Sequence, residues 1–219
     1  MVDVPGPVVV AVLTRAPSRG GGKSRLFAAL GCAPDEALLS ALLLDTLDGA
    51  TLPGTTRVIA VEPADACEDV RALVSGEIRV VPQAVGTLGD RMRTTMSELF
   101  GGGAGVVVLI GSDLPDITPD VIEHAVAHLA RDPDSLVLGP AADGGYYLIA
   151  ATREPDVFDA IDWGSPQVLE QTRAVAAGRG QRVHLIEPMR DVDTPDDLWS
   201  VTAPRTRAWL DRLSPKAPA

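Results

Sequence analysis

Carboxylates follow two predicted strands at the points where those strands end. Asp113 comes shortly after the apolar run 106–110, and Asp193 lies beyond the predicted strand 182–186. Open α/β sheets bind ligands at the carboxyl ends of their strands, and Mg²⁺ commonly takes one or two protein carboxylates and completes its shell with water and phosphate oxygens. These positions therefore indicate a Mg²⁺ or Mn²⁺ site on Asp113 and Asp193. Asp113 or Asp116 could alternatively cap a turn or the next helix.

Asp193 belongs to an acidic segment, 191–198, which leads into the last predicted helix. If the segment is extended, alternation points Asp191 to the same side as Asp193. Asp196 and Asp197 have a sufficient structural explanation, because acidic side chains are favoured at the positive end of a helix. We therefore assign these two to capping and only Asp193 to the metal site.

A basic, glycine-rich loop follows the first predicted strand. It contains Arg15, Arg19, Gly20, Gly21, Gly22, Lys23 and Arg25. Glycine lets the backbone approach a polyphosphate closely, and Lys and Arg donate charge-assisted hydrogen bonds to it. The loop therefore indicates an anion site, with a mobile, solvated loop as the alternative. It does not match a P-loop, because the first glycine of that pattern would fall at Pro17, which has no N–H to donate.

The turn formed by Asp143, Gly144 and Gly145 is predicted at the same edge of the sheet. Its glycines would let the chain pass close to a ligand, and Tyr146 or Tyr147 could stack on that ligand or hydrogen-bond to it. A tight turn with both tyrosines in the core is the alternative interpretation.

Histidines and cysteines do not form a competing site. His124 and His128 are four residues apart on a predicted helix, but no HExxH-like glutamate or third ligand accompanies them, which favours a surface pair over a zinc site. Cys32 and Cys67 lack metal-ligand spacing and cannot form a disulfide framework, as is typical of a protein in the reducing cytoplasm.

Composition excludes several classes of partner. The 219 residues are 46% hydrophobic, which is enough for one substantial core, and the formal net charge is −11. An anionic surface repels a phosphate backbone, so we expect no nucleic-acid partner. The apolar stretch near the amino terminus is too short for a membrane span, and we expect a cytoplasmic protein with no membrane partner.

Strands alternate with helices along most of the chain. The pattern predicts strands at 7–13, 57–61, 78–81, 106–110, 135–139, 146–150 and 182–186, and helices at 35–50, 64–74, 88–100, 119–130, 165–177 and from Pro195 through Trp199 and Trp209. Such alternation indicates an α/β fold, with a mostly parallel sheet covered by helices on both faces. The short spacing between 135–139 and 146–150 indicates an antiparallel pair. We expect a single domain over 1–213 and a frayed tail at 214–219.

A set of motifs occurs in a recognisable order. They are Arg-Ala-Pro with Gly-Lys-Ser-Arg-Leu at 15–26, Gln83 with Gly-Thr-Leu-Gly-Asp-Arg-Met at 86–92, Gly-Ser-Asp-Leu-Pro-Asp at 111–116, Gly-Pro with Asp-Gly-Gly-Tyr-Tyr at 139–147, Asp-Trp-Gly-Ser at 162–165 and Asp-Val-Asp-Thr-Pro-Asp-Asp-Leu at 191–198. As a set they resemble the bacterial glycosyltransferase-A-like family often labelled radical-SAM/selenodomain-associated transferase. That family looks related to the phospholactate guanylyltransferases and the molybdenum-cofactor nucleotidyltransferases.

The resemblance implies a nucleotide-diphospho-sugar transferase fold and assigns roles to the motif residues. It implies Asp113 and Asp193 as metal ligands, with Asp113, Lys23 and Arg25 as the catalytic set. Its nucleotide and phosphate contacts would be Arg15, Gly21, Gly22, Lys23, Arg25, Gln83, Gly89, Arg91 and Ser112. Its acceptor side would be Asp143, Gly144, Gly145, Tyr146 and Asp162.

Three functions are compatible with these residues. The first is nucleotidyl transfer from an NTP to a small phosphorylated or carboxylated acceptor; it is favoured because Gly111-Ser112-Asp113 has only the second carboxylate of the Asp-x-Asp typical of glycosyltransferases. The second is a glycosyltransferase that uses a nucleotide sugar on the same metal site, with Asp143 or Asp162 assisting the acceptor hydroxyl. The third is a non-enzymatic nucleotide-binding module with the last helix as a homodimer face. Thr-Arg-Ala-Pro follows the first predicted strand, where sugar nucleotidyltransferases carry a glycine-rich signature that binds the base.

Overall fold

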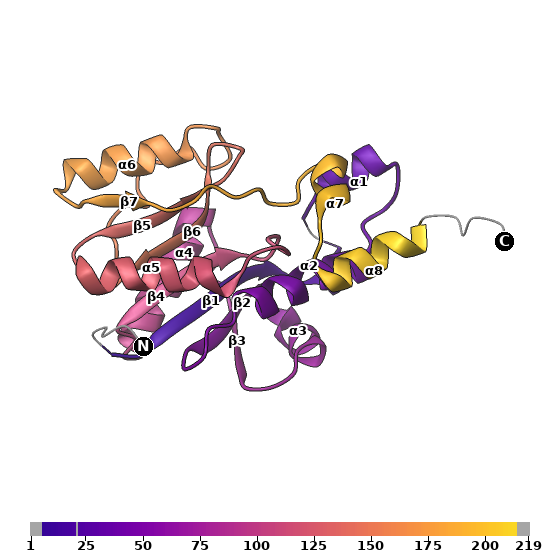
Figure 1. Cartoon of the computed structure of the whole chain (residues 1–219), viewed down its shortest axis with the longest axis horizontal. Helices are drawn as coiled ribbons and strands as arrows, with labels where there is room; N and C mark the ends of the chain where they lie inside the picture. Colours follow the sequence, from indigo (N-terminus) through magenta and orange to yellow (C-terminus); the bar gives the residue numbers. More distant parts are fainter. Residues whose placement is uncertain (1–5, 21, 214–219) are drawn as a thin grey trace.

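The computed structural model describes residues 6–20 and 22–213, so the predictions for Gly21 and for 214–219 lie outside the described residues. A seven-stranded sheet runs through the molecule in the order β3-β2-β1-β4-β6-β5-β7 (Figure 1). Its strands are β1 (Val8–Arg15), β2 (Thr56–Glu62), β3 (Ile78–Pro82), β4 (Val106–Gly111), β5 (Leu136–Pro140), β6 (Tyr146–Ala151) and β7 (Val183–Leu185). The predicted α/β class is confirmed.

The sheet is parallel except for β6. β6 pairs antiparallel with β5, as the short spacing between these two segments predicted, and it also pairs antiparallel with β4, which was not predicted. The strand order reverses between β1 and β4, because the chain moves outward from β1 through β2 and β3 and then returns to the other side of β1. This is the position at which open α/β sheets leave a crevice for a ligand.

Helices cover both faces of the sheet (Figure 1). One face is covered by α2 (Glu36–Gly49), α3 (Cys67–Leu73) and α5 (Pro119–Arg131), and the other by α4 (Leu88–Gly101) and α6 (Val168–Gly178). Side chains alternate between the two cores along each strand, so Val10 and Val12 enter one core and Val9 and Ala11 the other. Two short 3-10 turns, η1 (Pro17–Arg19) and η2 (Ala64–Ala66), complete the connections after β1 and β2.

A third cluster lies on the outer side of α2. It joins α2 to α1 (Ser24–Leu30), α7 (Pro195–Ser200) and α8 (Pro204–Leu213) through buried side chains that include Leu38, Leu42, Leu198 and Trp209. α2 is therefore apolar on two sides, with Leu43 and Leu47 packed toward the sheet. This double contact explains the broad apolar stripe of its sequence.

Two helix predictions are corrected. The expected last helix is interrupted: α7 ends at Ser200 and α8 begins at Pro204, because a proline disfavours a helical residue before it. α6 begins at Val168 and not at Ser165, whose hydroxyl accepts a hydrogen bond from the Gln167 N–H at 3.3 Å. In the described part of the chain, no helix combines the length and apolar character that crossing a membrane requires.

Candidate active site

A cavity of about 600 Å³ opens at the carboxyl ends of β1 and β4. Leu13, Thr14 and Arg15 line it from the end of β1, and Gly111, Ser112 and Asp113 line it from the end of β4. Of the residues predicted for the site, the cavity lining includes Arg15, Gly22, Lys23, Gln83, Arg91, Ser112, Asp113, Asp143, Gly145, Tyr146 and Asp193. The cavity occupies the crevice that the strand order creates.

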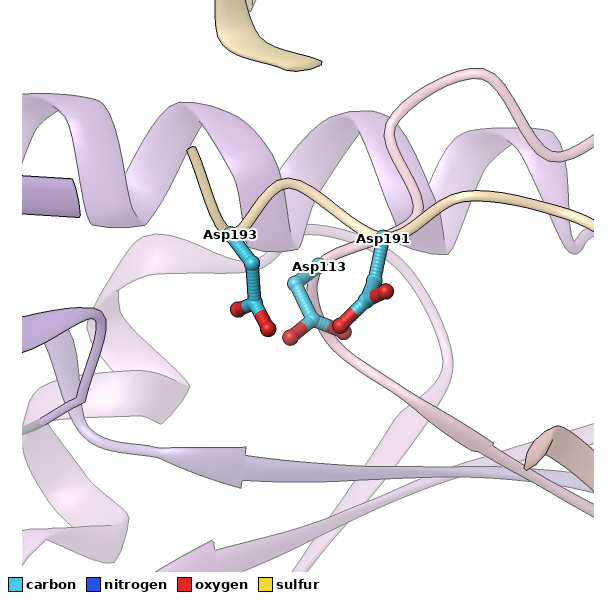
Figure 2. A group of neighbouring side chains, drawn as sticks. All are labelled: Asp113, Asp191 and Asp193. Atoms are coloured by element: carbon cyan, nitrogen blue, oxygen red, sulfur yellow. The ribbon is translucent and has the colours of Figure 1, made fainter. Parts of the chain in front are cut away.

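Three carboxylates converge in this cavity. Asp113 comes from the loop after β4, while Asp191 and Asp193 come from the extended segment that runs from β7 to α7 across the end of the sheet (Figures 1 and 2). One oxygen from each of the three side chains lies within 4.8 Å of the others. A hydrogen bond from the Val192 N–H to the Asp113 carbonyl, at 3.0 Å, holds the segment against the loop. Because Val192 points into the helical cluster, the residues on either side of it face the cavity.

Asp191 is the carboxylate that the sequence assignment left out. Alternation placed it on the same side as Asp193, but the assignment gave only Asp193 to the metal. In the structure, burial and the neighbouring charge of Asp113 raise the pKa of Asp191 to about 6. Burial and Asp113 therefore disfavour the charged form of Asp191, while the neighbouring Lys23 ammonium acts in the opposite direction.

Lys23 supplies a positive charge at the centre of this group. Its Nζ forms an ion pair with Asp113, donates to Asp193 Oδ1 at 2.6 Å and lies 3.8 Å from Asp191 Oδ2. Only 12% of its side chain is exposed. Burial acts to lower the pKa of the ammonium, but the charges and hydrogen bonds of Asp113 and Asp193 outweigh burial and raise it. Lys23 is therefore a fully charged partner of the three carboxylates.

Two arginines share one carboxylate on the same cavity wall. Arg15 Nε lies 3.1 Å from Glu62 Oε2, and Arg91 forms a second ion pair with the same oxygen. Two guanidinium groups around one carboxylate leave a net positive charge, and 56% of the Arg15 side chain is exposed. This pair can meet an anionic ligand. Glu62 was not predicted, although its position at the end of β2 was a signal for it.

Gln83 is fixed by the strand ends beside it. Its Nε2 donates to the Thr14 carbonyl at 2.9 Å and to the Ala60 carbonyl at 2.8 Å. These two acceptors decide the orientation of the amide, because its oxygen could not face them. Gln83 therefore joins the ends of β1 and β2 and keeps its own oxygen as an acceptor.

We expect Gln83→Glu to lower the free energy of unfolding by about 1–3 kcal/mol, because a carboxylate cannot donate to the two buried carbonyls. Urea denaturation measures this loss. Gln167→Glu is a matched control, since the Gln167 side chain makes no capping hydrogen bond at the start of α6. An unfolding midpoint of Gln83→Glu equal to that of the control would contradict the role given to this amide.

Asp143, Gly145 and Tyr146 of the predicted acceptor side line the cavity. Gly144 does not line it but lies between them in the turn. Asp143 Oδ1 accepts from the Gly145 N–H at 2.8 Å, and both residues line the cavity. Gly144 has a φ of +89°, and a Cβ there would lie 2.1 Å from the Pro166 carbonyl oxygen. Position 144 therefore requires glycine, because the turn and the segment around Pro166 approach each other closely. Tyr146 lines the cavity, while its hydroxyl is buried.

Three further predicted residues do not line the cavity. Arg25 is exposed on α1, and Asp162 lies on the loop before α6, where its N–H donates to Gln171 Oε1 at 2.8 Å. Gly89 lies under Trp163, where a Cβ would be 2.5 Å from the indole nitrogen. Trp163 itself lines the cavity and was not predicted. The Asp-Trp-Gly-Ser motif at 162–165 was a signal for this residue, but the assignment took only Asp162 from it.

Asp116 and Asp197 have the capping roles that the sequence allowed for them. Asp116 accepts from the Thr202 and Ala203 N–H groups at 3.0 and 2.8 Å, so it caps the connection before α8. Asp197 completes a capping box with Thr194 at the start of α7. Asp113 instead points into the cavity (Figure 2).

The histidines form a separate group. His128 stacks on His184 with ring centroids 3.6 Å apart, and His124 Nδ1 lies 3.1 Å from Glu187 Oε2. Among the residues that the structure describes, only Asp113, Asp191 and Asp193 bring together three atoms that could bind one metal ion, counting His nitrogen, Cys sulfur and carboxylate oxygen atoms.

Comparison with known proteins identifies the family. A family model described as "Uncharacterized protein conserved in bacteria (DUF2064)" matches residues 46–165, more than half of the chain. The chain belongs to this family. A phosphoenolpyruvate guanylyltransferase of Sphaerobacter thermophilus is 30% identical over 182 residues, which cover 80% of this chain and 84% of the relative. The resemblance drawn from the motifs is therefore confirmed.

Solved structures confirm the fold of this DUF2064 member. A protein of Desulfovibrio desulfuricans G20, described as a nucleotide-diphospho-sugar transferase, has a TM-score of 0.82 and 30% identity over 94% of both chains. CMP:2-keto-3-deoxy-manno-octonic acid synthetase complexed with CTP has a TM-score of 0.59 and 16% identity, over 94% of this chain and 99% of the other; this likeness concerns the fold alone. The predicted nucleotide-diphospho-sugar transferase fold is confirmed, and the chain is a nucleotidyltransferase-like transferase.

Proposed function

We propose that this protein is a divalent-metal-dependent nucleotidyltransferase that moves a nucleotidyl group from an NTP to a small phosphorylated or carboxylated acceptor. The observation that carries the proposal is the meeting of three carboxylates, Lys23 and an arginine pair in one cavity at the β1–β4 crevice. Such a site combines a place for a hard cation with separate positive groups for phosphates. The Sphaerobacter relative is named for guanylyl transfer to phosphoenolpyruvate, so GTP and phosphoenolpyruvate are the first substrates to test.

The ligand set fits Mg²⁺ or Mn²⁺. All three candidate ligands are carboxylates, which hard cations prefer, and the three side chains already surround a positively charged group. A divalent ion held by Asp113, Asp191 and Asp193 would supply positive charge at the phosphate oxygens. Asp113 is fixed at the end of a central strand and Asp191 and Asp193 by the bond from Val192, so the ligands are positioned before substrate binds.

The remaining residues would bind and orient the substrates. Lys23 and Arg15 would balance the charge of the pyrophosphate leaving group, and Glu62 would hold Arg15 and Arg91 in place. An acceptor phosphate or carboxylate oxygen would attack the α-phosphorus as the bond to the β-phosphate oxygen breaks, and pyrophosphate would leave. Because that oxygen is already anionic, no general base is needed. Asp143, Gly145 and Tyr146 would form the acceptor side of the cavity.

Thermal-shift measurements test this proposal across a panel of ATP, GTP, CTP, UTP and nucleotide sugars, each with and without Mg²⁺. A ligand that binds the folded state raises the melting temperature with concentration. We expect one NTP to stabilise the protein in a Mg²⁺-dependent way and its sugar conjugates to stabilise it less. The absence of stabilisation by any NTP would contradict the proposal.

A glycosyltransferase that uses a nucleotide sugar is the second candidate. The observation in its favour is the TM-score of 0.82 with a protein described as a nucleotide-diphospho-sugar transferase. Stronger stabilisation by a nucleotide sugar than by any NTP, with release of a nucleoside diphosphate, would support this function in place of nucleotidyl transfer.

A further inference from the structure

The Lys23 ammonium occupies the place where a cation between the three carboxylates would lie. It contacts Asp113, lies 2.6 Å from Asp193 Oδ1 and 3.8 Å from Asp191 Oδ2, and is largely shielded from solvent. The side chain comes from the residue directly before α1, and so joins the basic loop to the carboxylate group.

One ammonium and one divalent ion cannot share this position. The ligand oxygens lie within 4.8 Å of one another, which leaves room for one cation among them, and a Mg²⁺ ion needs oxygen contacts near 2.1 Å. A second positive charge a few ångströms away would be repelled in a partly buried site, where screening by water is weak. A metal ion therefore has to displace Lys23.

A polyphosphate bound in the cavity would be an alternative partner for the Lys23 ammonium. Gly22 has a φ of 97° and Lys23 a φ of 53°, so the chain turns sharply at the point where α1 begins. Gly22, Lys23 and Arg15 line the same cavity. A polyphosphate in the cavity would offer the ammonium anionic oxygens in exchange for those of the aspartates.

We propose that Lys23 is a placeholder cation, which makes binding of a divalent metal to Asp113, Asp191 and Asp193 conditional on a nucleoside polyphosphate. The inference rests on the proposed function and adds the order in which the nucleotide and the metal bind. Without nucleotide, Lys23 neutralises the carboxylates and excludes the metal. With nucleotide, Lys23 moves to the phosphates and the metal takes its place. Metal and nucleotide then raise each other's affinity by the same factor, as linkage requires.

Binding of Mn²⁺, measured by the electron paramagnetic resonance signal of the free ion and corrected for the Mn²⁺ that the nucleotide binds in protein-free solution, tests this inference without any turnover. A GTP analogue with a methylene group between the α- and β-phosphates serves as the nucleotide, and the same series is repeated with the ATP, CTP and UTP analogues. We expect the wild type to bind Mn²⁺ at least about tenfold more tightly with the matching analogue than without it. Lys23→Met should bind Mn²⁺ alone at least about tenfold more tightly than the wild type, because an uncompensated carboxylate group attracts a cation more strongly.

Arg19→Met is the matched control. It removes one positive charge from the same loop, but Arg19 pairs with Asp65 and Asp69 and not with the three carboxylates. We expect its affinity for Mn²⁺ to stay within about threefold of the wild type, because exposed charges at a distance are screened. Circular dichroism checks that each variant is folded, and Lys23→Gln replaces Lys23→Met if the latter is not.

Three results would overturn the inference, and they are distinguishable. If the wild type binds Mn²⁺ tightly with nucleotide but Lys23→Met and Lys23→Gln bind it alone no better than the wild type, Lys23 is not a placeholder while the proposed function stands. If neither the wild type nor the variants bind Mn²⁺ with any of the four analogues, the metal site itself is wrong and the proposed function fails with it. Equal Mn²⁺ affinity of the wild type with and without nucleotide also overturns the inference, because no coupling then exists.

Discussion

Asp113→Asn is expected to reduce turnover at least about a hundredfold while the protein stays folded, since loss of a positioned electrostatic group has an effect of this size. The substitution keeps the shape of the side chain and removes one of the three negative charges that meet at the candidate metal site. Asp113 also follows the central strand β4, which pairs with β1 on one side and β6 on the other. Steady-state kinetics with the NTP identified by thermal shift measures the change.

Asp120→Asn is the control for this variant. Asp120 is exposed in the first turn of α5, seven residues from Asp113, and it does not line the cavity. Its turnover should equal that of the wild type. Turnover of Asp113→Asn within a few-fold of this control, at saturating metal and with an unchanged melting temperature, would refute the assignment of Asp113.

Asp45→Ala is expected to lower the free energy of unfolding by about 2–4 kcal/mol, because it leaves two buried donors of Thr206 without their charged acceptor, at about 1–3 kcal/mol each. Only 1% of the Asp45 side chain is exposed. Its Oδ2 accepts from the Thr206 N–H and hydroxyl, both at 2.8 Å, and its Oδ1 accepts from the Arg205 N–H and Nη1, both at 3.2 Å. Asp45 on α2 thereby caps the start of α8, and alanine would leave buried donors without a partner.

Urea denaturation followed by tryptophan fluorescence measures this loss, because Trp209 on α8 is only 8% exposed. Asp48→Ala is the matched control, since Asp48 pairs with the same Arg205 from a side chain that is 61% exposed. Exposed pairs contribute less than about 1 kcal/mol. Similar losses in both variants would show that the buried cap does not hold α8 in place.

The architecture could be predicted because local signals agreed with it. The run 106–110 is apolar without interruption, which is typical of a strand buried on both faces, and β4 lies in the middle of the sheet. Asp113 and Asp193 could be placed at one edge because the carboxyl ends of parallel strands meet there. The helix caps followed the same local rules: Thr194 and Asp197 form the capping box, and Pro195 lies at the first helical position.

The remainder of the site depends on contacts between distant segments. Asp191 joins the site because the segment 186–194 docks on the loop after β4, and alternation alone could not show that docking. Asp45 gave no signal because its partners lie 160 and 161 residues away. Arg25 points away from the cavity because α1 begins at Ser24 and turns its side chain to the surface.

The most direct test of the central claim is product analysis by ³¹P nuclear magnetic resonance. Each of the four NTPs would be incubated with Mg²⁺ and phosphoenolpyruvate, or with other small phosphorylated or carboxylated acceptors, and nucleotide sugars would be incubated in parallel. Nucleotidyl transfer predicts acceptor-dependent release of pyrophosphate from one NTP and a new phosphorus signal for the nucleotidylated acceptor. Release of a nucleoside diphosphate from a nucleotide sugar, with no pyrophosphate from any NTP, would contradict the account.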